Sequence, residues 1–108
     1  MKPRTAAIAA LSLLAFRGGP ALADDSYRVA EQLGVLIGSE EFCGLVFDQG
    51  AIDDYIRTHV KPDDLDFSTH LDTQVWTARN GSKDMSASEK TARCTQVARN
   101  ARVLRLVK

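Results

Sequence analysis

The sequence VAEQLGVLIGSEEFCGLVF, residues 29–47, decides the fold. Its apolar side chains recur at helical spacing: Val29, Leu33, Leu36, Ile37, Cys43 and Phe47. This pattern predicts an amphipathic helix from about Ser26, a suitable N-cap, to Leu45. Glycines at positions 34, 38 and 44 weaken the helix by up to about 1 kcal/mol each relative to alanine. A bend or a break within it therefore stays open.

The cysteine in this helix, Cys43, has one partner available, because the chain holds two cysteines and the other is Cys94. A separation of 51 residues excludes a CxxC redox motif. The two histidines, His59 and His70, stand in positions unrelated to either cysteine. We therefore expect a structural disulfide, whose loop of about 52 residues would stabilise the fold by roughly 4 kcal/mol.

Three more helices are expected after the first. One runs from Asp48, an N-cap, to about Val60, with Ile52, Tyr55, Ile56, His59 and Val60 on one stripe. The next opens with Pro62 and the acidic residues that follow it, and stops at Asn80-Gly81, where glycine can form a left-handed cap. The last begins at the capping box Ser86-Ala-Ser-Glu89 and continues through Leu104. The prediction is an all-α, disulfide-linked bundle of about four helices.

The first 23 residues have the three zones of a secretory signal peptide. Lys2 and Arg4 give a positive start, residues 6–16 are uncharged, and Ala21-Leu-Ala23 places small residues before a cleavage site. The uncharged run is shorter than the roughly 20 residues that a transmembrane helix needs. We predict cleavage after Ala23, a single helical domain over 24–108, and a periplasmic location. An uncleaved anchor or a buried N-terminal helix is the alternative.

Charge is divided unevenly along the predicted domain. Residues 24–72 hold 12 acidic and 3 basic residues, whereas residues 73–108 hold 2 acidic and 8 basic ones. The acidic half packing against the basic last helix would explain this split inside the molecule. A partner-binding basic stripe is the functional alternative: Arg93, Arg99, Arg102, Arg105 and Lys108. Export and a negative total charge disfavour nucleic acid as the partner.

Other motifs give weaker indications. Asp63, Asp64 and Asp66 with His70 invite a metal site, but acidic residues at a helix start are common for dipole reasons, and we predict neither metal nor cofactor. Gly34-x-x-x-Gly38 indicates close packing of two helices, inside the bundle rather than in a membrane. We expect Trp76 to be a half-buried anchor. An exposed Trp76 near the basic helix would instead favour a binding surface.

The chain resembles small uncharacterised exported proteins of alphaproteobacteria. The residues that carry the resemblance are Leu33-Gly34-x-Leu36-Ile37-x-Ser39-Glu40-x-x-Cys43-Gly44-Leu45, then Ala51-Ile52-x-x-Tyr55-Ile56, then Lys83-Asp84-Met85-Ser86-Ala87-Ser88 and Cys94. In architecture alone it is similar to periplasmic acid-stress chaperones of the HdeA type. The residues around its cysteines differ from theirs, so the resemblance implies compartment and fold, and no functional residue.

These observations favour a non-enzymatic, exported binding or stress-response protein, because no catalytic constellation is present. Below about pH 4 most carboxylates protonate, and a helical domain held by one disulfide would then loosen and expose apolar surface to unfolded client proteins. The alternative is an accessory subunit that docks its basic C-terminal helix on an envelope protein. No transmembrane segment is expected in the mature chain.

Overall fold

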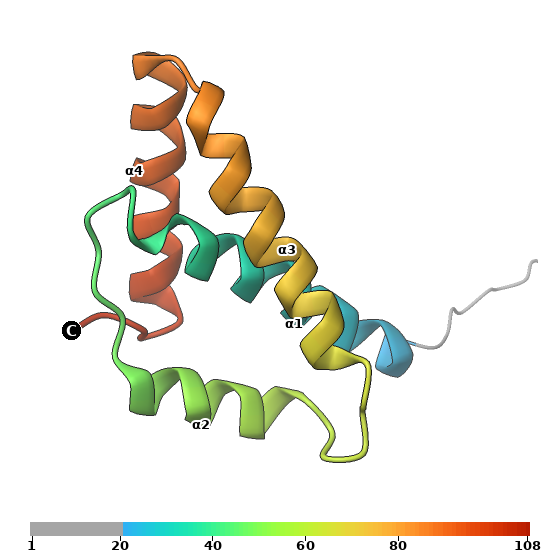
Figure 1. Cartoon of the computed structure of the whole chain (residues 1–108). Helices are drawn as coiled ribbons and strands as arrows, with labels where there is room; N and C mark the ends of the chain where they lie inside the picture. Colours follow the sequence, from blue (N-terminus) through green and yellow to red (C-terminus); the bar gives the residue numbers. More distant parts are fainter. Residues whose placement is uncertain (1–20) are drawn as a thin grey trace, which may run out of the picture.

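The structure is a computed structural model that describes residues 21–108, with side chains described from Ser26 onward. Four α-helices and one short 3-10 helix follow in order: α1 Ala21–Glu40, α2 Gln49–His59, α3 Phe67–Gly81, η1 Ser82–Asp84 and α4 Ala87–Val103. The described residues contain no strand. The predicted all-α, four-helix architecture is therefore confirmed. Figure 1 shows α1 at the centre, α3 across it, α4 beside one end and α2 on a side of its own.

The first helix begins earlier than predicted, at Ala21 rather than Ser26. Alanine and leucine before Ser26 are good helix formers, so Ser26 lies inside the helix rather than at its cap. Most of the predicted signal peptide, residues 1–20, lies outside the described residues. Residues 21–23 form the first turn of α1.

The end of α1 is a Schellman motif. The Leu45 N–H donates to the Glu40 carbonyl at 2.9 Å, and the Gly44 N–H to the Glu41 carbonyl at 3.1 Å. Gly44 has the left-handed φ of 70° that this motif requires and that costs glycine least. The predicted boundary at Leu45 is therefore wrong by a few residues, because Gly44 stops the helix rather than weakening its interior.

The glycines of α1 admit α3 closely. A methyl group on Gly38 would stand 2.6 Å from the Val75 carbonyl oxygen and 2.8 Å from Ala78 Cβ, and one on Gly34 would overlap Gln74 Cβ. Of the helix pairs, α1 and α3 have the most extensive contact. The close-packing interpretation of Gly34-x-x-x-Gly38 is thereby confirmed.

The third helix differs from its prediction at both ends. It begins at Phe67, after a turn over residues 61–66, because Asp64 caps its first turn from outside the helix. At the other end Gly81 keeps a right-handed φ of −63°, and the chain continues into η1. The expected left-handed cap at Gly81 is therefore wrong.

Two predicted N-caps are present as expected. The Asp48 side chain accepts the Ala51 N–H at the start of α2. At the start of α4, Ser86 and Glu89 form both hydrogen bonds of a capping box.

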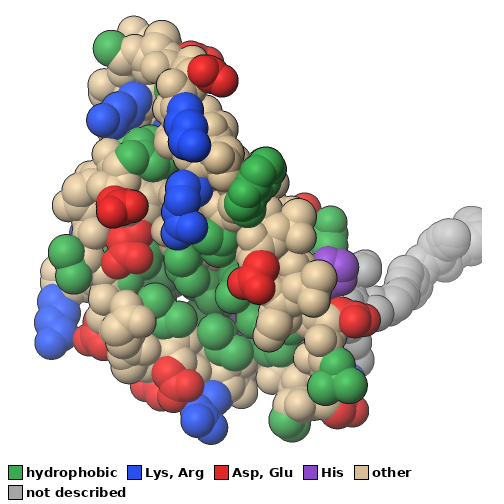
Figure 2. All heavy atoms as spheres, viewed as in Figure 1, with side chains coloured by type: hydrophobic (Ala, Val, Ile, Leu, Met, Phe, Trp, Pro, Cys, Tyr) green, Lys and Arg blue, Asp and Glu red, His purple; other side chains and the backbone are tan. Residues whose placement is uncertain are grey.

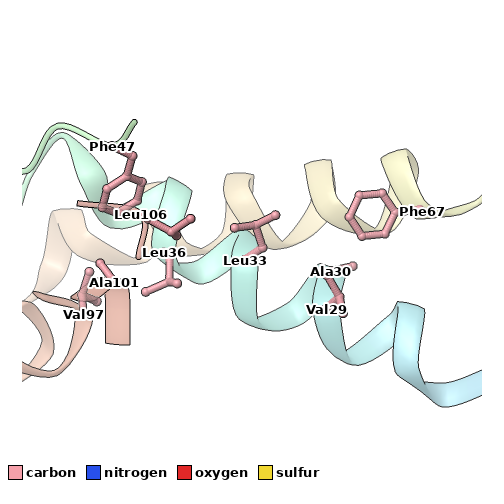
Figure 3. Close-up of a cluster of buried hydrophobic side chains, with 9 residues drawn as sticks. All are labelled: Val29, Ala30, Leu33, Leu36, Phe47, Phe67, Val97, Ala101 and Leu106. Carbon is pink, nitrogen blue, oxygen red and sulfur yellow. The ribbon is translucent and has the colours of Figure 1, made fainter. Parts of the chain in front are cut away.

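The core lies along α1 and has two groups, which Figure 3 shows at opposite ends of the view. One group combines Leu36 with Phe47, Val97, Ala101 and Leu106, and the other combines Val29 and Ala30 with Phe67. Leu33 is fully buried and lies between them.

The first of these groups is closed covalently. The disulfide Cys43–Cys94 is present, with the Cα atoms 5.3 Å apart, and ties the end of α1 to α4 as predicted. A second Schellman motif ends α4: the Leu106 N–H donates to Ala101 and the Arg105 N–H to Arg102. This motif turns Leu106 into the core, where it is fully buried.

Candidate functional site

The second helix covers one side of the core without entering it. None of its residues is buried. Its apolar side chains, Ile52, Tyr55 and Ile56, are half-buried and pack against the core, as does Val60 just beyond its end. We call the segment Gln49–Val60 the α2 cover. Figure 2 shows hydrophobic side chains gathered in the hollow between α2 and the helices above it.

A cleft opens where the α2 cover leads into α3. Its volume is about 430 Å³, and its apolar lining comes from Ile56, Val60, Pro62 and Phe67. The side chain of Phe67 is 7% exposed, so the cleft reaches the edge of the core. Lys61 is among the charged residues at this cleft. The cover is thus incompletely sealed at its C-terminal end.

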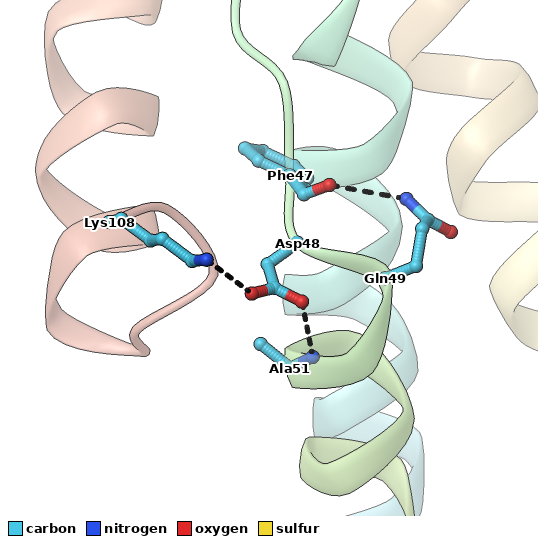
Figure 4. A network of polar contacts seen from close by, with 5 residues as sticks. All are labelled: Phe47, Asp48, Gln49, Ala51 and Lys108. Carbon is cyan, nitrogen blue, oxygen red and sulfur yellow. Dashed lines mark hydrogen bonds and ion pairs between the residues drawn. The ribbon is translucent and has the colours of Figure 1, made fainter.

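The N-terminal end of the α2 cover is held by two carboxylates. Glu40 Oε2 accepts the Phe47 N–H at 2.7 Å. Asp48 Oδ1 accepts the Ala51 N–H at 3.1 Å, and its other oxygen lies 3.9 Å from Lys108 Nζ (Figure 4). The Asp48 N–H itself donates to the Leu106 carbonyl at 2.7 Å. Sequence reasoning identified Asp48 as a cap but missed Glu40, because nothing in the spacing of Glu40 and Phe47 marks this bond.

The turn that connects the α2 cover to α3 is held by a third carboxylate. Asp64 Oδ1 accepts the N–H groups of Asp66 at 3.0 Å and Phe67 at 3.1 Å. These bonds fix the turn between α2 and α3. Hydrogen bonds from backbone N–H groups to charged carboxylates are about twice as strong as bonds between neutral groups. Both connections of the cover therefore rest on acidic side chains.

Of the four residues considered and not predicted as a metal site, Asp64 fixes the turn, whereas Asp63, Asp66 and His70 are exposed. Asp64 is committed to the turn, and the His70 N–H donates to the Asp66 carbonyl within the helix. The His70 ring lies against Tyr27 with centroids 5.1 Å apart. Over residues 26–108, no group of three or more histidine, cysteine, aspartate or glutamate side chains is placed to hold a metal ion.

The predicted basic stripe does not lie on one face. Arg93 is half-buried, with Nη1 buried and without a hydrogen-bond partner, whereas Arg99, Arg102, Arg105 and Lys108 are exposed. Arg93 and Arg102 are nine residues apart, which places them on about opposite sides of an α-helix. Arg105 stands at the left-handed position of the second Schellman motif, with φ 63°. Of the five residues of the predicted stripe, all except Arg93 are exposed.

Intramolecular pairing accounts for little of the charge split. In the described part of the chain two ion pairs are present. Asp53–Arg57 lies within α2, at 2.8 Å, and the Asp53 hydrogen bond raises the pKa of Arg57 above its ordinary value. Lys108–Asp48, at 3.9 Å, is the one that joins the acidic and basic halves. Apart from the half-buried Arg93, the basic side chains of residues 73–108 are exposed.

A projecting arm carries much of this positive charge. Residues 79–96, here called the α3–α4 arm, include no buried residue and hold four basic and two acidic side chains. Figure 2 shows lysine and arginine side chains along the upper part of the molecule and most acidic ones below. Trp76, at the base of the arm, is 65% exposed. The prediction of a half-buried Trp76 is wrong, because α3 buries Phe67 and Ala78 on its other faces.

The capping box at the tip of the arm has an electrostatic consequence. The Ser86 N–H donates to Glu89 Oε1 at 2.8 Å. This bond, with the Ser86 hydroxyl, lowers the pKa of Glu89 from its ordinary value. The box is thus tightest while Glu89 is ionised.

The comparisons with protein-family models, curated proteins and solved structures found no match. The resemblance to exported alphaproteobacterial proteins and to HdeA-type chaperones therefore stays a prediction. Over residues 21–108, no helix has the length and apolar character needed to cross a membrane.

Proposed function

We propose that this chain is an exported, non-enzymatic binding protein that acts in acid stress by releasing the α2 cover and offering its apolar core surface to unfolded clients. The observation that carries the proposal is the attachment of α2. The helix has no buried residue, yet its half-buried side chains lie on the core. The helices α1, α3 and α4 each contain buried residues and α2 contains none, so releasing α2 leaves the buried side chains of the other helices in place. Its release uncovers apolar side chains that a client can bind.

Acid would weaken the connections on both sides of the α2 cover. Four backbone N–H groups in these connections donate to side-chain carboxylates, and such charge-assisted hydrogen bonds are stronger than neutral ones. Most carboxylates in proteins lose their charge below about pH 4. Residues 24–108 keep 11 lysine and arginine side chains, whose mutual repulsion then acts without opposing carboxylates. The Cys43–Cys94 disulfide survives, so the loosened chain stays compact and able to refold.

The test is the protein without its leader, taken from neutral pH to about pH 3, below the ordinary pKa of aspartate and glutamate. We expect it to bind a hydrophobic dye and to suppress aggregation of an unfolded client at the low pH only. A native near-UV circular dichroism signal with no dye binding at about pH 3 would refute the proposal.

A double variant tests whether the acid response arises at the N-terminal end of the α2 cover. Glu40→Gln with Asp48→Asn removes the two charges at the N-terminal end of the cover while keeping side chains that accept hydrogen bonds. We expect dye binding by this variant already at neutral pH. Glu41→Gln with Asp54→Asn is the matched control, since both residues are exposed and neither side chain accepts a hydrogen bond in the described chain. Equal dye binding by the two variants would place the response elsewhere.

Export has a separate test. Expression of the full chain in a bacterial host should deliver a periplasmic protein whose mass corresponds to a chain beginning at Asp24. Retention of residues 1–23 in the mature protein would contradict the predicted cleavage.

A second candidate function rests on the exposed charges of α4. Arg99 and Arg102 are exposed, and neither forms an ion pair within the described residues. This favours an accessory subunit that docks the basic helix on an acidic envelope protein. Changing Arg99, Arg102 and Arg105 to glutamate should abolish recovery of that protein in a pull-down, whereas Lys90→Glu should not. Recovery unaffected by the triple change would exclude this function.

A further inference from the structure

The second half of α3 and the short helix η1 after it carry an exposed tryptophan and two positive charges. Trp76 is 65% exposed, Arg79 follows it by about one turn of α3, and Lys83 follows in η1, where it is also exposed. Neither cation forms an ion pair within the described residues. Asp72, one turn before Trp76, is the acidic residue on this side. We call Trp76, Arg79 and Lys83 the Trp76 face. Tryptophan and arginine are enriched among residues that dominate binding energy at protein interfaces.

A segment of opposite character precedes the same helix. Residues 63–66, here called the Leu65 loop, hold three aspartates around Leu65, whose side chain is 87% exposed. Asp64 is turned inward to cap α3, so Asp63 and Asp66 remain exposed beside Leu65. The loop thus presents an apolar side chain flanked by two negative charges, and no base pairs with them in the described chain.

These two features complement each other but do not meet within one molecule. Trp76 lies nine residues after Phe67, so about 14 Å of helix separates it from the loop. Both Leu65 and Trp76 stay exposed as a result. We propose that the Trp76 face of one copy binds the Leu65 loop of a second copy, with Leu65 on the indole ring and Asp63 and Asp66 beside Arg79 and Lys83.

The contact would be head-to-tail, since the two surfaces lie at different places on the same chain. Each bound copy then leaves one free face and one free loop, so association continues unless a ring closes. The contact is small and charged, so it should be weak, reversible and sensitive to salt. This inference concerns the folded protein at neutral pH and is independent of acid-driven release of the α2 cover.

Trp76 provides a direct signal, because it is the only tryptophan in the chain. At low ionic strength, raising the protein concentration should increase the sedimentation coefficient and shift the fluorescence emission of Trp76 to shorter wavelength. Salt at about 0.5 M, where the Debye length is only about 4 Å, should reverse both changes. A sedimentation coefficient and an emission maximum that stay constant with concentration at low salt would overturn the proposal.

Charge reversal supplies the specific test. Arg79→Glu with Lys83→Glu, and Asp63→Lys with Asp66→Lys, should each abolish self-association, and mixing the two variants should restore a complex. Lys90→Glu with Asp54→Lys, which touches neither surface, is the control and should associate normally. Far-UV circular dichroism establishes that each variant is folded. Association that persists in both reversed variants, or a mixture of folded variants that forms no complex, would contradict the proposed contact.

Discussion

Helices α2 and α3 both pack on α1, but they do so in different ways. The backbone of α3 approaches Gly34 and Gly38 closely enough to exclude a methyl group. In contrast, α2 touches the core through half-buried side chains, and the segments before and after it are held by hydrogen bonds to carboxylates. Backbone-to-backbone packing leaves no room for adjustment, whereas side-chain packing at a surface opens locally at low cost. One chain thus combines a helix pair in close backbone contact with a helix that packs only through half-buried side chains.

The largest effect is expected from truncation in the two packing environments. Leu33→Ala, at a fully buried position on α1, should lower the free energy of unfolding by about 2–5 kcal/mol. Ile56→Ala, at a half-buried position on α2, should lower it by only about 1 kcal/mol, because less apolar surface is lost. Chemical denaturation with the disulfide intact measures both. Equal losses would show that α2 is as firmly packed as α1.

Glycine substitutions probe the α1–α3 contact directly. Gly38→Ala should lower the free energy of unfolding by about 1–3 kcal/mol, since the added methyl group meets the backbone of α3. Gly81→Ala is the matched control, because nothing lies within 4 Å of its added methyl group and its φ is right-handed. It should raise the stability by up to about 1 kcal/mol. Thermal unfolding of the two variants should thus shift in opposite directions, and a stabilising Gly38→Ala would contradict the close contact.

The capping box of α4 has a pH dependence of its own, which can be measured apart from any effect of acid on the α2 cover. Ser86→Ala should cost about 1 kcal/mol at neutral pH. The pKa of Glu89 is lowered in the folded state, so its contribution is present above the ordinary pKa of glutamate and is lost as the pH falls through the folded value. The destabilisation by Ser86→Ala should therefore shrink in acid. A constant destabilisation from neutral pH to about pH 3 would contradict the role of the ionised Glu89.

The smallest change in stability is expected at the turn that ends α4. This turn also accepts a hydrogen bond from Asp48, at the start of the α2 cover. Arg105 occupies a left-handed conformation that favours glycine, and the next residue, Leu106, accepts the Asp48 N–H. Arg105→Gly should raise the free energy of unfolding by a few tenths to about 1 kcal/mol, because it relieves the strained φ. Denaturation midpoints measure the change. A lower midpoint would indicate that the Arg105 side chain contributes more than its strained backbone costs.

Much of the fold could be predicted from sequence, because local rules govern it. Helical periodicity, the caps at Asp48 and Ser86, the pairing of Cys43 with Cys94 and the packing of Gly34 and Gly38 all rest on local or unique relationships. The sequence places the left-handed cap at Gly81, whereas the structure has it at Gly44. Both are glycines near a helix end, and only the path of the chain beyond them decides which one adopts a positive φ.

The candidate site was less predictable, because it depends on tertiary placement. The bond from the Phe47 N–H to Glu40 joins residues seven apart across a turn, and no sequence pattern announces it. The exposure of Trp76 follows from which face of α3 meets α1, and a single tryptophan on a mixed helix is compatible with either side. The charge split was visible in the sequence, but its nearly complete lack of internal pairing was not.

The central claim is that the α2 cover opens separately from the rest of the domain. Amide hydrogen exchange of the intact, oxidised protein tests this most directly. Amides of Gln49–His59 should exchange with an opening free energy well below that of α3 amides in the α1 contact, and, after correction for intrinsic rates, the gap should widen as the pH falls toward about 4. Equal opening free energies for α2 and α3 at both pH values would contradict the claim.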